Sequence, residues 1–319
     1  MQAARLVAPR TFEIQEVALP PLGPNEIRFK VELCGICASN LGPWRGAPWF
    51  TYPFDPGAPG HEAIGTVVET GSAVQGVTAA ERVAALSQNG FAEYDRADAG
   101  SVVTIPAELR SRPFLGEPLA CAVNVIKRAG LREGDWVAVV GLGFLGMLLV
   151  QLAQAHGTRV IALSSRPESL RLAQQLGAQA ALETGDGTRI LERVNALTSG
   201  QLCPVVIEAA GYQSTLDLAA EITGVRGRLL IAGYHQDGPR SVNLQLWNWR
   251  GLDVINAHER DQAVYVQGMR DALELIANGT LRLNRLITHY VAMSDLNQGF
   301  QLVEARPGGF VKAVMVGPR

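Results

Sequence analysis

Hydrophobic and charged positions alternate strictly early in the chain. Ile27, Phe29, Val31 and Leu33 are separated by Arg, Lys and Glu residues, and this period of two is typical of a half-buried strand. Short β-rich runs follow, and Gly, Pro and Asn residues separate them. These further expected strands are Ala63–Val68, Arg82–Leu86, Phe91–Tyr94 and Val102–Ile105. The pattern therefore predicts a β-rich N-terminal region.

The pattern changes near Glu117, where continuous apolar strands begin to alternate with helical stretches. Such an alternation indicates a parallel sheet that is covered by helices on both faces. The expected strands are Trp136–Val140, Arg159–Leu163, Val205–Glu208, Arg228–Ala232 and Leu252–Asn256. The expected helices are Phe144–His156, Glu168–Leu176 and, later in the chain, Gln262–Ala277, and a closing strand is expected at Phe310–Val316.

A chain of 319 residues has room for two ordinary domains. We predict an α/β protein with a Rossmann-type doubly wound parallel sheet in residues 118–258. Residues 1–117 and 259–319 are expected to form the β-rich second domain.

Composition narrows the functional classes. Hydrophobic residues make up 47% of the chain and charged residues 18%, with 28 basic and 30 acidic residues, so neither disorder nor a basic nucleic-acid surface is indicated. The longest apolar stretch, Val137–Val150, has 14 residues and contains three glycines, which is too short for a membrane span. The chain start lacks an apolar signal core, and four Cys do not make a disulfide framework. We therefore expect a cytoplasmic protein without nucleic-acid or membrane partners.

A glycine-rich turn follows the expected strand Trp136–Val140. Gly141-Leu142-Gly143-Phe144-Leu145-Gly146 stands between that strand and a helix, which is the context that a dinucleotide site requires. Gly141 permits the tight turn, Gly143 lets the backbone approach the pyrophosphate, and Gly146 lets helix and strand pack closely. The helix N-terminus attracts the phosphates.

The end of the next strand bears on the choice between NAD and NADP. An NAD site usually places Asp or Glu there to bind the ribose 2′-hydroxyl, but this strand ends in Ser164-Ser165-Arg166. Two hydroxyls and a guanidinium suit a 2′-phosphate. The residues therefore favour NADP over NAD, unless Arg166 is only a solvated residue at the start of the next helix.

Four motifs in series suggest a family. Cys34–Asn40 reads CGICASN, Pro59–Glu62 reads PGHE, Glu117–Ala120 reads EPLA, and the glycine-rich turn comes next. Their order and spacing resemble the medium-chain dehydrogenase/reductase superfamily, and more closely its zinc-dependent alcohol and polyol (sorbitol-type) dehydrogenases. The resemblance covers essentially the whole chain and implies that the β-rich domain is GroES-like and catalytic.

The resemblance implies a catalytic zinc. Cys37 matches the thiolate ligand, His61 the imidazole ligand and Glu117 the third-ligand position of the polyol-type branch. Glu62 matches either a carboxylate behind the ligands or a ligand that exchanges with water. Three protein ligands and one open position make a catalytic site.

The resemblance also implies roles for further residues. Ser39 matches the hydroxyl that passes on the proton of the substrate alcohol, and Phe144, Leu145, Gly233 and Lys312 match positions that bind the cofactor. Members with a second, structural zinc carry a Cys-rich lobe before a GGFAEY-like segment. That lobe is missing here, since Ala84–Asn89 runs directly into Gly90–Tyr94. One zinc per chain is therefore expected.

The resemblance also implies an activity and an assembly. The expected reaction is hydride transfer between a nicotinamide cofactor and an alcohol or carbonyl substrate, which is a polyol, a sugar-like compound or an aromatic alcohol. The alternatives are a zinc-free enone or quinone reductase on the same fold and a non-catalytic dinucleotide-binding protein. A homodimer or homotetramer is expected, with Leu229–Ala232 or Leu252–Asn256 as an edge strand. The aromatic residues of the loop Trp44–Phe54 are expected to border the substrate cleft, to anchor the loop itself or to form a subunit contact.

Overall fold

The chain folds into two compact units in a computed structural model that describes residues 1–318. Unit 1 comprises Met1–Ala120, Asp261–Asn278 and the chain from Leu283 onward, and unit 2 comprises Cys121–Arg260 and Gly279–Arg282. The sequence places the domain boundaries after residues 117 and 258, and the contacts divide the chain after Ala120 and Arg260. Within residues 1–318, no helix combines the length and the apolar character that crossing a bilayer requires.

Unit 2 contains a six-stranded parallel sheet, which confirms the predicted fold class. The strands are β8 (Trp136–Val140), β9 (Arg159–Ser164), β10 (Ala180–Glu183), β11 (Cys203–Glu208), β12 (Thr223–Ile231) and β13 (Asp253–Asn256). They lie in the order β10-β9-β8-β11-β12-β13, so chain neighbours β10 and β11 lie apart and β8 is central. Every residue of β8 is buried, as its unbroken apolar run predicts.

The helices of unit 2 connect these strands. They are α3 (Phe144–Ala155), α4 (Pro167–Gln175), α5 (Gly187–Leu197), α6 (Gln213–Glu221) and α7 (Leu244–Arg250). Helix α2 (Gly116–Ala129) begins in unit 1 and enters unit 2 at Cys121. The order of the sheet reverses direction between β8 and β11, and ligands of such sheets bind outside the carboxyl ends of the strands at that point.

Unit 1 is built on a β-sheet with one long central strand. Strand β3 (Glu26–Gly35) pairs with β4 (Glu62–Thr70), β6 (Tyr94–Asp98) and β15 (Ala313–Val316). The outer strands are β5 (Arg82–Ala85), β7 (Val102–Thr104) and β14 (His289–Ala292), and β1 (Gln2–Ala8) and β2 (Thr11–Glu16) form a separate hairpin.

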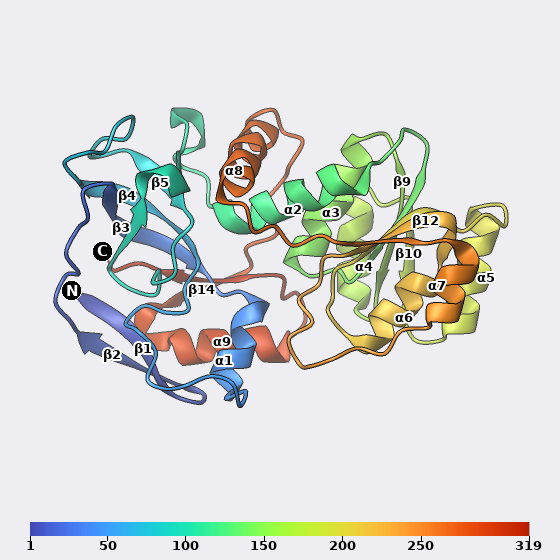
Figure 1. Cartoon of the computed structure of the whole chain (residues 1–319), viewed down its shortest axis with the longest axis horizontal. Helices are drawn as coiled ribbons and strands as arrows, with labels where there is room; N and C mark the ends of the chain where they lie inside the picture. The colour runs from blue at the N-terminus through green and yellow to red at the C-terminus, as the bar shows by residue number, and fades with distance from the viewer. Residues whose placement is uncertain (319) are drawn as a thin grey trace. The chain divides into compact units, whose positions relative to one another are not determined.

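Two helices of unit 1 come from distant parts of the chain and lie side by side (Figure 1): α1 (Leu41–Arg45) and α9 (Leu296–Ala305). The carboxylate of Glu304 accepts hydrogen bonds from Arg45 and from Arg10, both at 2.8 Å. The remaining long helix of this unit is α8 (Gln262–Ala277). Strand β15, near the end of the chain, pairs with β3, so the end of the chain and its first part share one sheet.

Some expected elements differ from the structure. The strand expected at Phe91–Tyr94 instead begins at Tyr94, because the backbone of Phe91 bonds to Gly57 and Ala4 rather than to a ladder neighbour. The pattern did not predict the hairpin of β1 and β2, strands β10 and β14, or helices α1, α2, α5, α6, α7 and α9. Strand β10 has only four residues, and so short an element is poorly marked by the hydrophobic pattern.

A buried carboxylate fastens the short loop that stands where the Cys-rich lobe is missing. Asp95 on β6 is 3% exposed and accepts hydrogen bonds from the backbone N–H groups of Asn89 (3.2 Å) and Arg96 (2.7 Å). Burial raises the pKa of Asp95 from 3.8 to about 6, although the backbone hydrogen bonds and the nearby hydroxyl of Ser87 oppose this rise. The folded chain therefore holds the Asp95 proton more tightly than the unfolded chain does.

This pKa difference predicts a pH dependence of stability. As pH rises from about 4 to about 6, the unfolded chain loses the Asp95 proton first, so the free energy of unfolding falls by about 3 kcal/mol and then levels off. Replacing Asp95→Asn removes this slope, although one backbone N–H then loses its acceptor. Denaturant unfolding of both proteins between pH 4 and 7 measures the difference, and parallel pH profiles would contradict the account.

Candidate functional site

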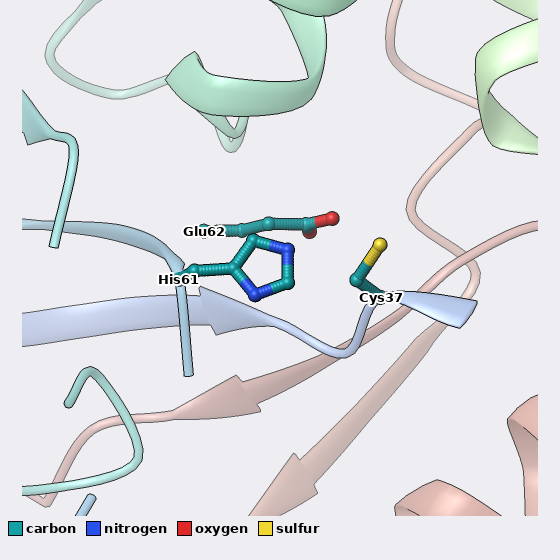
Figure 2. Close-up of side chains that lie close together, drawn as sticks. All are labelled: Cys37, His61 and Glu62. Atoms are coloured by element: carbon teal, nitrogen blue, oxygen red, sulfur yellow. The ribbon is translucent and has the colours of Figure 1, made fainter. Parts of the chain in front are cut away.

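Strand pairing brings two sequence motifs of unit 1 together. Cys37 follows β3, and His61 and Glu62 stand at the start of β4. The two strands are antiparallel, with Gly35 opposite Glu62. Figure 2 shows the thiol, the imidazole and the carboxylate pointing toward a common region, and one ligand atom from each residue lies within 4.8 Å of the others.

The imidazole of His61 is oriented by its own backbone. Its Nδ1 lies 3.1 Å from the carbonyl oxygen of Pro59, and the amide of Asn40 donates to the same oxygen at 3.0 Å. A proton on Nδ1 satisfies this contact and leaves the lone pair of Nε2 for a metal. Asn40 therefore helps to hold the loop that carries His61.

The charges around His61 suit a cation. Burial lowers the pKa of His61, but the hydrogen bond and charge of Cys37 and the charges of Glu117 and Glu62 raise it more, to about 10. A sulfur, an imidazole nitrogen and a carboxylate oxygen are ligands that zinc takes in proteins. The residues present therefore fit the metal that the family resemblance implies.

Glu62 also forms a buried ion pair. Its carboxylate oxygens lie 2.7 and 2.6 Å from the ammonium nitrogen of Lys312, which is 5% exposed. Burial lowers the pKa of Lys312, but the nearby charge of Glu62 raises it above its ordinary value. The ion pair accounts for Lys312 in the fold, and its predicted contact with the cofactor stays a prediction.

Gly35 is required by this arrangement. A Cβ atom at position 35 would overlap the carboxylate of Glu62 and the side chain of Leu115. The glycine of the CGIC motif therefore lets the buried carboxylate lie against β3.

Glu117 lies at the edge of this cluster. It stands in the first turn of α2, and the hydroxyl of Tyr265 on α8 donates to its Oε1 at 3.1 Å. The charge of Glu117 helps to raise the pKa of His61. Among residues 1–318, however, the side chains whose ligand atoms lie within 4.8 Å of one another are Cys37, His61 and Glu62. Sequence reasoning missed Tyr265, since nothing in its local pattern marks it.

Ser39 and two cysteines outside the cluster have clear positions in the fold. Ser39 is half-buried in a short 3₁₀ turn, two residues after Cys37. Burial raises the pKa of Cys34 well above its ordinary value and that of Cys203 to about 12. These two thiols therefore stay protonated and pack in the cores.

In unit 2, the glycine-rich turn has the geometry that its sequence predicts. Gly141 has a φ of 102°, and a Cβ there would meet Ala210, while a Cβ at Gly146 would overlap the carbonyl oxygen of Gly141. Nothing lies within 4 Å of the position that a Cβ would take at Gly143. Gly143 caps α3 without a side-chain hydrogen bond, so Phe144 and Leu145 begin a helix whose first N–H groups can face a phosphate.

The carboxyl end of β9 carries the three residues predicted to select the cofactor. Ser164 is buried, Ser165 is exposed, and Arg166 is half-buried at the start of α4. The hydroxyl oxygen of Ser164 accepts a hydrogen bond from the backbone N–H of Arg166 at 3.1 Å. This bond fixes the turn from which the guanidinium extends.

A buried carboxylate joins the loops after β11 and β12. Glu208 is fully buried, and its Oε1 accepts from the backbone N–H groups of Ala210 and Gly211 at 2.8 Å. Its Oε2 lies 3.1 Å from Nε2 of His235, whose Nδ1 accepts from Arg240 at 2.8 Å. Both ring nitrogens of His235 therefore have partners, and the side chain links the loop after β12 to Glu208.

The same carboxylate explains Gly233, which was predicted to bind the cofactor. A Cβ at Gly233 would meet the backbone nitrogen of Gly211 and Oε2 of Glu208. The glycine therefore lets the two loops lie close together at the carboxyl edge of the sheet.

The aromatic loop of unit 1 is largely anchored. Trp44 is buried, stacks at 5.6 Å on Phe300 and lies under the guanidinium of Arg10. The ring of Phe54 contacts both Phe50 and Tyr52. For Trp44 the anchoring alternative is correct, whereas Trp49 is 60% exposed.

Comparisons with known proteins agree with this geometry. A family profile described as "Alcohol dehydrogenase GroES-like domain" matches residues 23–107, and one described as "Zinc-binding dehydrogenase" matches residues 145–278. An alcohol dehydrogenase of Geobacillus stearothermophilus is 32% identical, with 92% of this chain and 93% of the relative covered. A sorbitol dehydrogenase of Halalkalibacterium halodurans is 26% identical over the same shares.

Solved structures show the same fold. A zinc-binding dehydrogenase from Sinorhizobium meliloti 1021, solved with bound NADP, superposes with a TM-score of 0.84. It is 26% identical, and the match covers 99% of this chain and 98% of that one. With the metal-ligand cluster in one unit and the glycine-rich turn in the other, this chain belongs to the medium-chain dehydrogenase/reductase superfamily, in its zinc-type alcohol and polyol dehydrogenase branch, and is an NAD(P)-dependent alcohol oxidoreductase.

Proposed function

We propose that the protein is a single-zinc alcohol dehydrogenase that prefers NADP and acts on a polyol or another polar alcohol. The observation that carries the metal assignment is the cluster of Cys37, His61 and Glu62 in unit 1. The sorbitol dehydrogenase among the relatives supports a polyol. A zinc-free enone or quinone reductase would have no use for such a ligand set.

Each residue of the cluster has a chemical task in this proposal. Cys37, His61 and Glu62 hold the zinc, with Glu117 as the alternative third ligand. Zinc in an open site acts as a Lewis acid toward the substrate oxygen, and the nicotinamide supplies or accepts the hydride. Ser39 Oγ accepts the proton of the substrate hydroxyl and donates its own proton onward, because a hydroxyl does both.

The metal assignment predicts zinc content and its dependence on two carboxylates. Protein purified without chelator should contain about one zinc per chain, and Cys37→Ser should lose it. Glu117→Gln should lower the zinc affinity about tenfold, as expected for a group that supports the ligands without binding the metal. Glu62→Gln should lower the zinc affinity more, because it removes a ligand. Competition with a chromogenic chelator measures the affinities.

Three outcomes would contradict or change this assignment. Two tightly bound zincs per chain would contradict the single site. Tight zinc binding in a Cys37→Ala, His61→Ala double variant would show that the metal lies elsewhere. A larger loss in Glu117→Gln than in Glu62→Gln would exchange the roles of the two carboxylates.

The donors at the end of β9 predict a preference for NADPH over NADH. A charge-assisted hydrogen bond from Arg166 to the 2′-phosphate contributes about 1.5–3 kcal/mol, or roughly one to two decades in affinity. Arg166→Ala should therefore raise the Kd of NADPH by that factor and leave the Kd of NADH nearly unchanged. Arg171→Ala, which removes an exposed guanidinium from α4, is the matched control. Equal losses for both cofactors in Arg166→Ala would refute this role.

Unit 2 also carries a surface that suits self-association. Strand β13 is at the edge of the sheet, whereas β12, the other predicted edge, lies inside it. An unpaired edge strand readily pairs with another chain. Helix α7 precedes β13, has no buried residue and presents Trp249 with 88% of its surface exposed. We propose that two copies meet along β13 and α7.

This surface predicts at least a dimer in solution. Trp249→Ser removes apolar area from the contact and should shift the mass measured by light scattering at micromolar concentration toward the monomer. Trp49→Ser, which changes an exposed tryptophan of unit 1, should leave the assembly unchanged. A monomeric unmodified protein would contradict the proposal.

A further inference from the structure

A carboxylate that the local sequence does not reveal lies beside the predicted 2′-phosphate site. Strands β9 and β10 are parallel neighbours, and the residue paired with Ser164 is Glu183. The backbone N–H of Thr184 donates to the carbonyl oxygen of Ser164 at 3.0 Å, so the pairing persists to the ends of both strands. Paired residues of adjacent strands carry their side chains on the same face of a sheet.

The position of Glu183 matters because of where the adenosine ribose lies. In a doubly wound sheet, the ribose 2′ position is read at the carboxyl end of the second strand, which here is the end of β9. Adjacent strands lie about 4.8 Å apart. A glutamate side chain is long enough to span that separation, so the carboxylate of Glu183 can extend to a ribose bound beside Ser164.

Glu183 is available for such a contact. Its side chain is exposed, and within residues 1–318 it forms no hydrogen bond or ion pair. Arg166 has partners of its own, and Glu183 is not among them. Ser164 therefore has a basic residue two positions further along the chain and an acidic residue opposite it on the neighbouring strand.

We propose that Glu183 is a specificity-determining residue that restrains the binding of NADP(H). A carboxylate accepts a hydrogen bond from a ribose 2′-hydroxyl and repels a 2′-phosphate. Arg166 acts in the opposite sense, so the cofactor preference depends on the balance of two charges. The inference rests on the proposed binding of the adenosine ribose at this sheet edge.

The test compares cofactor affinities in Glu183→Gln, which keeps the shape and removes the charge. Kd values of NADPH and NADH are measured by cofactor fluorescence, and adenosine 2′,5′-bisphosphate is titrated by calorimetry as a probe that needs no turnover. We expect Glu183→Gln to tighten NADPH and the bisphosphate by about five- to tenfold and to leave NADH equal or up to about twofold weaker. Because the effect is a repulsion between charges, it should shrink at high salt.

Glu192→Gln is the matched control, since it removes one exposed negative charge from α5 of the same unit. It should leave all three affinities within about twofold of the unmodified protein, as expected for a screened, distant charge. Unchanged affinities in Glu183→Gln, or changes equal to those in Glu192→Gln, would overturn the inference. Glu183→Lys provides a second variant and should tighten NADPH further.

The two proposals fail separately. If the unmodified protein binds NADH better than NADPH but Glu183→Gln tightens NADPH, the proposed NADP preference is wrong and the role of Glu183 stands. If Arg166→Ala behaves as expected and Glu183→Gln changes nothing, Arg166 alone reads the phosphate and the inference about Glu183 is wrong.

Discussion

The antiparallel register of β3 and β4 is the constraint on which the metal site depends. It sets Gly35 opposite Glu62, and a side chain at position 35 would overlap that carboxylate. With the glycine in place, the ends of the two strands carry Cys37 and His61 into reach of one another. A slip of one residue would turn the side chains to opposite faces and would disperse the cluster.

Charge is balanced inside unit 1 rather than by solvent. The carboxylate of Glu62 is buried, and an unpaired buried carboxylate is costly, so Lys312 from the loop before β15 supplies the opposite charge. Tyr265 donates to Glu117 and offers a neutral partner to a second carboxylate. The chain thus keeps two acids near one imidazole and one thiol, which is an environment that attracts a divalent cation.

The sequence predicts most strands of unit 2 well, because these strands are continuous apolar runs. Strand Trp136–Val140 of unit 2 has the predicted bounds, and so does helix Gln262–Ala277 of unit 1. The motifs also mark Cys37 and His61. The sequence does not reveal the side-chain contacts made by Tyr265, Lys312 and His235. Each of these residues bonds to a partner at least 27 residues away in the chain. Strand pairing alone sets Glu183 opposite Ser164, so the residues that follow β9 in the sequence do not reveal it.

The central claim is that one zinc binds to one thiolate, one imidazole and a carboxylate of unit 1. X-ray absorption at the zinc edge of the purified protein tests it most directly. The account predicts a first shell with a single sulfur at about 2.3 Å and nitrogen and oxygen ligands at about 2.0–2.2 Å. A shell of several sulfurs, or a shell without sulfur, would contradict it.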